Sequence, residues 1–377
     1  MKRRQALWAP WPLLAKDAWA QLNPALPAEP VERLASAWRV ATGPAAADDT
    51  TQGHHVGVLR VDWALGQVQV QADVPVPSRA HGLLALADGG FLALANRPGR
   101  WLLRCDAQGQ VIQLRRLDGE PRTLNGHAAS SADSRWIFTT ETDPTTGTGW
   151  ISVRDARTLA RVTQIESHGV DPHQLLWAPD GQLVVANGGI ARDALGRKLA
   201  GETMAPSLVL IKAESGRLMD RWTLPDPQLS LRHLAWSAGP ERLLGVALQA
   251  EHPSAAERQA APTLAVWDGE QLKLPTADSR AGGYAGDIAA GPGGGFVISA
   301  QKQGRGLWWH PAQPQQMTLV AELTEPCALV AWPDGRGVSL SAGRGVARWH
   351  SQMAPRMLRW PMPLAPDNHW VRLAGLG

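Results

Sequence analysis

Short apolar stretches alternate with polar turns along most of the chain, at the spacing of β-strands. In the segment HGLLALADGG at residues 81–90, an apolar run meets a turn of Asp, Gly and Gly. Pro-Asp-Gly or Pro-Gly-Gly turns recur at 179–181, 292–294 and 333–335, and such combinations fix tight-turn geometry. Later in each unit come hairpin segments with period-two alternation, such as VWDGEQLKL. Each unit is therefore predicted to supply four short antiparallel strands.

A polar residue marks the start of the inner strand in most of these units. The seven markers, 40 to 60 residues apart, are His81, His127, His173, His233, Asp287, Cys327 and His369. A repeat of this length with turns inside it is typical of a β-propeller. The predicted fold is all-β, a single seven-bladed propeller over residues 37–377, because no blade can bury its own faces alone.

The two ends of the chain are predicted to share one blade. Residues 37–42, 56–63 and 67–74 supply three strands, and residues 369–373 supply the missing innermost strand. This 3+1 clasp between the termini pairs a strand edge that would otherwise stay open.

Two units carry insertions that fit no strand pattern, at 187–206 and 249–262. They fall between the second and third strands of their blades, so we expect them beside the mouth of the central channel. They are either a lid or tolerated surface loops.

The N-terminus has the pattern of an export signal. Basic residues at 2–4 precede a mostly apolar stretch, and Ala-Trp-Ala at 18–20 offers a cleavage site. Residues 1–20 are therefore predicted to be an export signal, of twin-arginine type or of the general secretory type, and 21–36 a linker. No later stretch has the ~20 apolar residues that a membrane span needs. The expected location is the periplasm.

Composition excludes several classes of partner and cofactor. The net charge is +3 and no dense basic run follows residue 4, which argues against nucleic-acid binding. The two cysteines form no CxxC motif, which argues against covalent haem and a zinc knuckle. Tryptophan dominates the aromatic residues, and Trp177, Trp236 and Trp332 follow their markers closely, so we expect them to pack between blades. A monomer is expected.

The markers are predicted to converge at the channel mouth. Neutral imidazole is a ligand for copper, zinc, iron and nickel, so the five histidines, with Asp287 and Cys327, are candidate ligands for a transition metal, iron or copper. Two alternatives stay open. The histidines could have a purely structural role, with hydrogen bonds within their blades, or they could act in acid–base catalysis.

Charged and polar residues near the markers form a second candidate set. Arg79 and Arg232 come just before His81 and His233, and Arg97 lies in a turn. With Glu141 they could form salt bridges below the rim, or they could bind an anion or a carboxylate, since a guanidinium holds a carboxylate through two hydrogen bonds. Asn187 could support either role. The candidate cofactor-binding residues are Arg79, Arg97, Glu141, Asn187 and Arg232.

Several short motifs resemble the DUF1513 family of exported bacterial proteins. They are RAHGL, ANRPG at 95–99, NGH at 125–127, TTETD at 139–143, DPHQL at 171–175, ANGGI at 186–190, MAPSL at 204–208 and LRHLA at 231–235. The family motif around His127 tends to read GHG, whereas here Ala128 follows the histidine. The resemblance covers about residues 37 to 373 and implies a periplasmic seven-bladed propeller. Genes of this family commonly lie beside those of imelysin-like and di-haem peroxidase-like proteins, which implies metal handling with such partners.

Three functions follow from these features. The first is binding of a transition metal, or of a metal-bearing partner, at the channel mouth, in iron or other metal uptake. The second is an enzyme, a metal- or quinone-dependent oxidoreductase or a hydrolase, with its site at the same mouth. The third is a scaffold whose flat faces dock other proteins. A fold alone does not decide between them.

Overall fold

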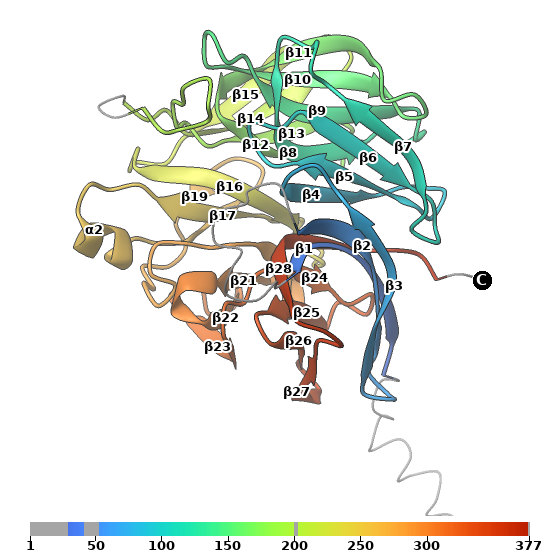
Figure 1. The fold of residues 1–377 in the computed structure, drawn as a ribbon. Coiled ribbons are helices and arrows are strands. Elements are labelled where there is room, and N and C mark those ends of the chain that lie inside the picture. Colours follow the sequence, from blue (N-terminus) through green and yellow to red (C-terminus); the bar gives the residue numbers. More distant parts are fainter. Residues whose placement is uncertain (1–28, 41–52, 200–202, 376–377) are drawn as a thin grey trace, which may run out of the picture.

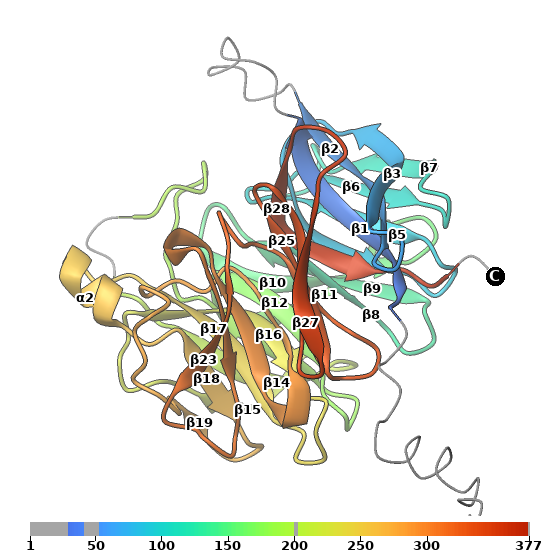
Figure 2. The same cartoon turned by 90° about the horizontal axis from the view of Figure 1, so that it is seen from below.

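The computed structural model describes residues 29–40, 53–199 and 203–375. Within this part, seven four-stranded antiparallel sheets are arranged around one axis (Figures 1 and 2). The innermost strands contact one another in sequence around a closed ring. The predicted all-β, seven-bladed propeller is confirmed. The proposed export signal at 1–20 lies outside the described residues.

Blade 1 joins the two ends of the chain. Its sheet is built from β28 (Leu364–Arg372), β1 (Val31–Val40), β2 (His54–Asp62) and β3 (Gln67–Pro75). The C-terminal β28 is innermost and pairs antiparallel with β1, so the red end of the ribbon lies against its blue start (Figure 1). The predicted 3+1 clasp is confirmed.

Strand β1 begins at Val31, whereas the sequence predicted a strand from residue 37. The missed part contains Glu32 and Arg33, which are charged yet 1% and 8% exposed. Glu32 accepts hydrogen bonds from Trp63 Nε1 at 2.6 Å and from Arg372 at 2.5 Å. Buried charges are tolerated when they are paired and hydrogen-bonded, so a polar sequence forms a buried strand here.

Blades 2, 3 and 4 each use four strands that are consecutive in the chain. Blade 2 contains β4 (Ala80–Ala85), β5 (Phe91–Ala95), β6 (Trp101–Cys105) and β7 (Val111–Arg116). Blade 3 contains β8 (Thr123–Ser130), β9 (Trp136–Thr142), β10 (Thr148–Asp155) and β11 (Arg161–Val170). Blade 4 contains β12 (Pro172–Trp177), β13 (Leu183–Asn187), β14 (Ser207–Lys212) and β15 (Arg217–Trp222).

Blades 5, 6 and 7 follow the same order from the axis outward. Blade 5 contains β16 (Leu229–Trp236), β17 (Leu244–Ala250), β18 (Leu264–Trp267) and β19 (Leu272–Lys273). Blade 6 contains β20 (Ile288–Ala290), β21 (Phe296–Ala300), β22 (Arg305–Trp309) and β23 (Met317–Glu322). Blade 7 contains β24 (Leu329–Ala331), β25 (Gly337–Ala342), β26 (Gly345–His350) and β27 (Met353–Arg359). Helix α2 (Ala255–Ala260) and the 3-10 turns η1 (Pro292–Gly294) and η2 (Gln301–Gln303) lie in connections.

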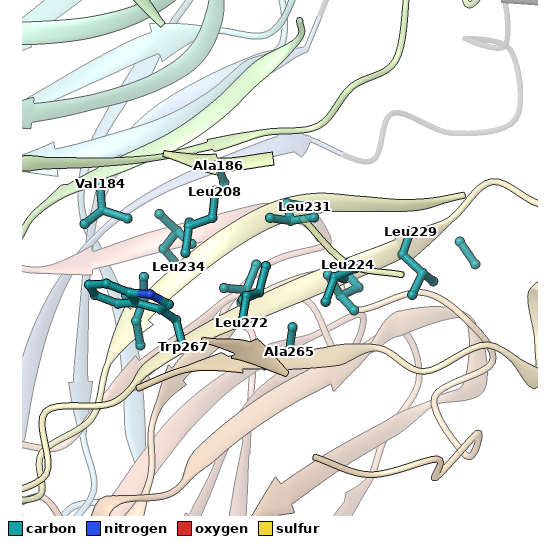
Figure 3. Close-up of a cluster of buried hydrophobic side chains, with 14 of the residues drawn as sticks. Val184, Ala186, Leu208, Leu224, Leu229, Leu231, Leu234, Ala265, Trp267 and Leu272 are labelled. Atoms are coloured by element: carbon teal, nitrogen blue, oxygen red, sulfur yellow. The ribbon is translucent and has the colours of Figure 1, made fainter. Parts of the chain in front are cut away.

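The hydrophobic core lies between the blades. Seven clusters of buried apolar side chains each join residues of two neighbouring blades. Between blades 4 and 5, Val184 and Leu208 pack against Leu231 and Leu234 (Figure 3). Full burial of one such side chain stabilises the fold by about 1.5–3 kcal/mol. Each sheet face is therefore covered by its neighbour, which holds the innermost strands in a fixed ring.

The tryptophans that follow the markers bind one blade to the next. Trp177 donates from Nε1 to the carbonyl of Ser130 in blade 3 at 2.5 Å. Trp236 donates in the same way to the carbonyl of Trp177 at 2.9 Å. Trp332 packs in the cluster between blades 1 and 7. The predicted packing role is confirmed. In the described ranges no helix has the length and apolar character to cross a bilayer.

Candidate metal centre

All five marker histidines lie in irregular parts of innermost strands. The pairing register of β4 shifts between Ala80 and Leu83, on either side of His81, and similar shifts enclose the other four histidines. A bulge re-aims a side chain away from the direction that regular pleating gives it. The innermost strands of blades 6 and 7 show no shift in their ladder pairs.

Glycines let the bulged strands come close together. Gly126 has φ of 102°, and a Cβ there would lie 2.7 Å from Cδ2 of His81. A Cβ on Gly82 would lie 2.0 Å from the carbonyl oxygen of Gly126. Neither position accepts a side chain without movement of its neighbours. Ala128, the departure from the family motif, pairs regularly with Thr139.

The imidazole rings meet at the channel axis. Nine pairs of these rings have centroids 4.3 to 6.1 Å apart, and His233 and His369 form the closest pair. One ligand atom from each of His81, His127, His173 and His233 lies within 4.8 Å of the others. A second group at the same spacing contains His233, Asp287 and His369. The fold therefore brings together six of the seven predicted ligands.

Most of these rings carry a buried nitrogen without a hydrogen-bond partner among the described residues. Such atoms are both ring nitrogens of His81, Nε2 of His127, Nδ1 of His233 and Nε2 of His369. An unsatisfied buried polar group costs about 1–3 kcal/mol, so a ligand that bonds to these nitrogens would remove that cost. Neutral imidazole nitrogens are donors for transition metals. The residues present thus fit a metal ion.

The cluster is held in the neutral form that coordination needs. Burial lowers the pKa of His81 to about 3, with His369 and Arg79 adding to this and Asp367 opposing it. Burial also holds the pKa values of His127, His173 and His233 well below the usual histidine range, and repulsion from neighbouring imidazoles and arginines lowers them further. Because metal ligands must be deprotonated, the rings are ready to bind at neutral pH.

A chain of hydrogen bonds fixes the proton positions on two of the rings. Arg97 lies 2.7 Å from Nδ1 of His173, and Nε2 of His173 lies 2.7 Å from Nε2 of His233. Burial lowers the pKa of Arg97 to about 9, so its guanidinium stays protonated at neutral pH and must donate. His173 then accepts at Nδ1 and donates from Nε2 to His233. This hydrogen bond therefore engages Nε2 of His173 and Nε2 of His233, two nitrogens of the cluster.

Beside this chain, a single carboxylate holds three arginines. Asp171 forms ion pairs with Arg97, with Arg232 at 3.1 Å and with Arg192 at 3.5 Å. Although burial alone raises the pKa of Asp171, the attraction of Arg97, Arg232 and Arg192 brings it below its usual range. Arg97 and Arg232 were predicted site residues and lie here. Asp171 and Arg192 were not predicted.

A second carboxylate pairs with the remaining predicted arginine. Arg79 binds Asp367 through two hydrogen bonds, of 2.6 and 3.0 Å. The same carboxylate faces Nδ1 of His81 at 3.9 Å. Burial raises the pKa of Asp367, but His81 and Arg79 outweigh this and bring it below the usual range. Asp367 was also missed by the sequence interpretation.

The two markers without imidazoles are engaged by backbone groups. Asp287 accepts from the amides of Ile288 and Leu329, at 2.9 and 2.8 Å, and its Oδ1 lies 3.3 Å from Nδ1 of His369. Cys327 donates its thiol to the carbonyl of Glu325 at 3.2 Å, and burial raises its pKa to about 12. The structure places Cys327 outside both histidine groups.

Two other predicted residues lie away from the cluster. Glu141 accepts from Arg154 and from Ser152, each at 2.7 Å, and not from the predicted arginines. The amide of Asn187 donates to the carbonyl of Ser167 at 3.0 Å and to Ser207 at 3.3 Å. Both side chains are buried. Glu141 bonds within blade 3, and Asn187 joins blade 4 to Ser167 of blade 3, so both have a structural role.

The two insertions touch each other beside the arginines. Lys198 of the first forms an ion pair with Glu251 of the second, at 2.6 Å to its Oε1. The first insertion also carries Arg192, whose Nε faces Asp171. The insertions therefore contribute to the channel rim, as the sequence predicted, whereas a lid function remains a prediction.

Comparison with known proteins identifies the family. The family model described as "Protein of unknown function (DUF1513)" matches residues 74–373. The chain belongs to the DUF1513 family. This DUF1513 protein matches none of the curated proteins it was compared with. Hydrazine synthase of Kuenenia stuttgartiensis is a similar solved structure, with a TM-score of 0.57 and 14% identity over 82% of this chain and 92% of that one. At this identity the likeness supports the fold alone.

The missed carboxylates carry a signal in the sequence. Asp171 and Asp367 each stand two residues before a marker histidine, as do Arg79 and Asn125. A polar residue this close to a marker in the sequence is a candidate for the channel rim, although the bulges there break regular alternation. Arg192 has no such signal, since it reaches Asp171 from an insertion with no regular spacing.

Proposed function

We propose that this DUF1513 protein binds a transition-metal ion in its central channel, through the imidazoles of His81, His127, His173 and His233. The observation that carries the proposal is the convergence of four buried histidines whose ligand atoms lie within 4.8 Å of one another. A ligand set of neutral nitrogens suits iron, copper, zinc or nickel better than calcium or magnesium, which prefer oxygen.

We further propose iron or copper as the bound metal and metal handling in the periplasm as its role. The N-terminal sequence supports export, and the family resemblance supports a link with imelysin-like and di-haem peroxidase-like proteins. In this role the ion is cargo, and the channel histidines supply its ligands. His233 belongs to both ligand groups, so the ion can be held toward either blade 3 or blade 1.

The direct test is metal content after natural export. We expect about one equivalent of a transition metal per chain, and loss of thermal stability on chelation, because binding to the folded state stabilises it. Replacement of His127 and His173 by alanine should remove the metal. His310→Ala is the matched control, because His310 lies in blade 6 outside both ligand groups. Metal below about 0.2 equivalents, with stability unchanged by chelator, would contradict the proposal.

Catalysis at the same mouth is the second candidate, and one observation favours it. The hydrogen-bonded chain from Arg97 through His173 to His233 offers a path for a proton beside the ligand cluster. An oxidoreductase of this kind would carry a coloured metal or quinone centre. An absorbance spectrum of exported protein tests for such a centre, since a colourless protein with one equivalent of zinc would leave only binding or hydrolysis.

A further inference from the structure

The arginine cluster beside the histidines has more positive charge than its own carboxylate offsets. Arg97, Arg192 and Arg232 share the one carboxylate of Asp171, and their side chains are 11%, 17% and 9% exposed. No other acidic side chain forms an ion pair with these three in the described part of the chain. Two guanidinium charges at the rim are therefore left over among the described residues.

Donor groups of this cluster also remain free. Arg192 Nε is buried and makes no hydrogen bond to any described residue. Arg232 donates to Asp171 from one nitrogen alone, among the contacts of the described ranges. The Asp171 carboxylate itself shows which ligand these donors suit, because its two oxygens accept from two different arginines. A guanidinium can also hold such a planar group through paired hydrogen bonds.

This charge lies directly against the rings proposed to hold the metal. Arg97 is 2.7 Å from Nδ1 of His173, and Arg232 is the chain neighbour of His233. A cation in the cluster would be repelled by both guanidiniums, at a site where burial weakens screening. The Arg97 contact also keeps a proton on Nε2 of His173, where it occupies a nitrogen that faces the cluster.

We propose that the rim binds a small carboxylate or carbonate anion through Arg97, Arg192 and Arg232, and that this anion and the metal ion bind together. This inference rests on the proposed function. An anion offsets the excess charge and competes with His173 for the donors of Arg97. Once Arg97 is released, the proton of His173 can move to Nδ1, and Nε2 is free to face the cluster. By linkage, each ligand then raises the affinity for the other by the same factor.

The anion either comes free from solution, as bicarbonate does, or belongs to an organic acid that already carries the metal. Both present the same planar oxygens to the arginines. Acetate and bicarbonate represent the free anion, and the nickel complex of citrate represents the organic chelate. Tighter binding of the preformed complex than of nickel with acetate would identify the chelate as the source.

The test is calorimetric titration of metal-free full-length protein with Ni²⁺, in bicarbonate-depleted buffer containing chloride and in the same buffer with acetate or bicarbonate at equal ionic strength. We expect the anion to raise nickel affinity about 10-fold, within the usual range of coupling between two sites. Arg192→Gln should reduce this gain to less than about 2-fold. Arg197→Gln is the charge-matched control in the same insertion, because Arg197 pairs with Asp193 and is 74% exposed, and it should keep the full gain.

Equal nickel affinity with and without anion would overturn the inference while leaving metal binding intact. No nickel binding in any buffer would instead refute the proposed function. If Arg192→Gln does not fold, the reverse titration decides, because acetate must bind wild-type protein more tightly in the presence of nickel by the same factor. A gain that persists in folded Arg192→Gln would assign the anion to another site and also contradict the proposal.

Discussion

Blades 1 to 5 and blades 6 and 7 use the same position of the innermost strand in two different ways. In the first five blades the strand bulges and turns an imidazole into the channel, where most rings keep an unpaired nitrogen. In blades 6 and 7 the corresponding residues, Asp287 and Cys327, precede the innermost strands β20 and β24 and bind backbone groups nearby. The equivalent position thus places an imidazole in the channel in five blades and a hydrogen-bond partner of the backbone in two.

The difference shows that a sequence repeat alone does not determine the role of the repeated residue. Duplication places an equivalent residue at each point of the ring, but local backbone geometry decides whether that residue faces a ligand or caps a strand.

The largest expected effect of this difference is on acid stability. Four channel histidines have pKa values lowered by burial, so the unfolded chain binds more protons than the folded one below pH 6.5. Their contribution is fully present above pH 6.5 and is lost as the pH falls toward about 3, the pKa of His81. Between pH 7.5 and 5, each lowered histidine should reduce the free energy of unfolding by about 2 kcal/mol. Urea unfolding of metal-free protein at several pH values measures this.

A single-site variant sharpens that test. His81→Gln should reduce the slope of stability against pH by about one proton, or about 1.4 kcal/mol per pH unit. A flat stability profile between pH 7.5 and 5 in wild-type protein would contradict burial of neutral rings.

The next effect is on metal affinity. Replacing both His127 and His173 by alanine removes two of the four converging ligands, so affinity for Ni²⁺ should fall by at least about 100-fold, more than the usual loss of one supporting residue. Calorimetric titration measures the change, with His310→Ala as the unaffected control. Unchanged affinity in the folded double variant would place the ion elsewhere.

Asp287→Ala tests whether the blade 6 equivalent of the channel histidines has a structural role. It leaves the buried amides of Ile288 and Leu329 without their acceptor, and we expect a loss of about 1–3 kcal/mol in the free energy of unfolding. Nickel affinity tests the contact with His369. If affinity falls as far as in the double histidine variant while stability is unchanged, Asp287 is a ligand and the contrast between the blades is wrong.

Cys327→Ala should have the smallest effect. The thiol makes one weak hydrogen bond and lies outside both ligand groups, so stability should change by less than about 1 kcal/mol. Addition of Co²⁺ to wild-type protein should give no thiolate-to-metal absorption band. Such a band, lost in Cys327→Ala, would show that the thiol reaches the ion.

The fold was predictable because its signals are periodic. Marker spacing and Pro/Asp/Gly turns predict the blades, and a missing inner strand at the start of the chain predicts the clasp. The start of β1 was not predictable in this way, because the charges of Glu32 and Arg33 hide a buried strand. Glu32 accepts from Trp63 and Arg372, and Arg33 donates to the carbonyls of Ala107 and Ala374. Apart from Trp63, which lies in the same hairpin, these partners meet the strand only when distant segments assemble.

The site was predictable in its imidazoles and less so in its carboxylates. The spacing of the histidines predicted that they converge, because equivalent positions of a closed ring lie at the same level of their blades. The same spacing also predicted Cys327, which lies outside both ligand groups. Which arginine pairs with which acid depends on side-chain reach across blades. Arg97 therefore pairs with Asp171, 74 residues away, rather than with Glu141. Arg79, at the start of blade 2, likewise pairs with Asp367 of blade 1, 288 residues away.

The clasp connects closure of the ring with the proposed metal site. His369 lies on the last strand, whose pairing with β1 is what shuts the circle, and it shares a ligand group with His233 of blade 5. If the proposed ion is bound by both side chains, it links the last strand directly to blade 5. Separation of the C-terminal strand would then break metal–ligand bonds as well as the pairing with β1, so ring closure would be more stable when the channel is occupied.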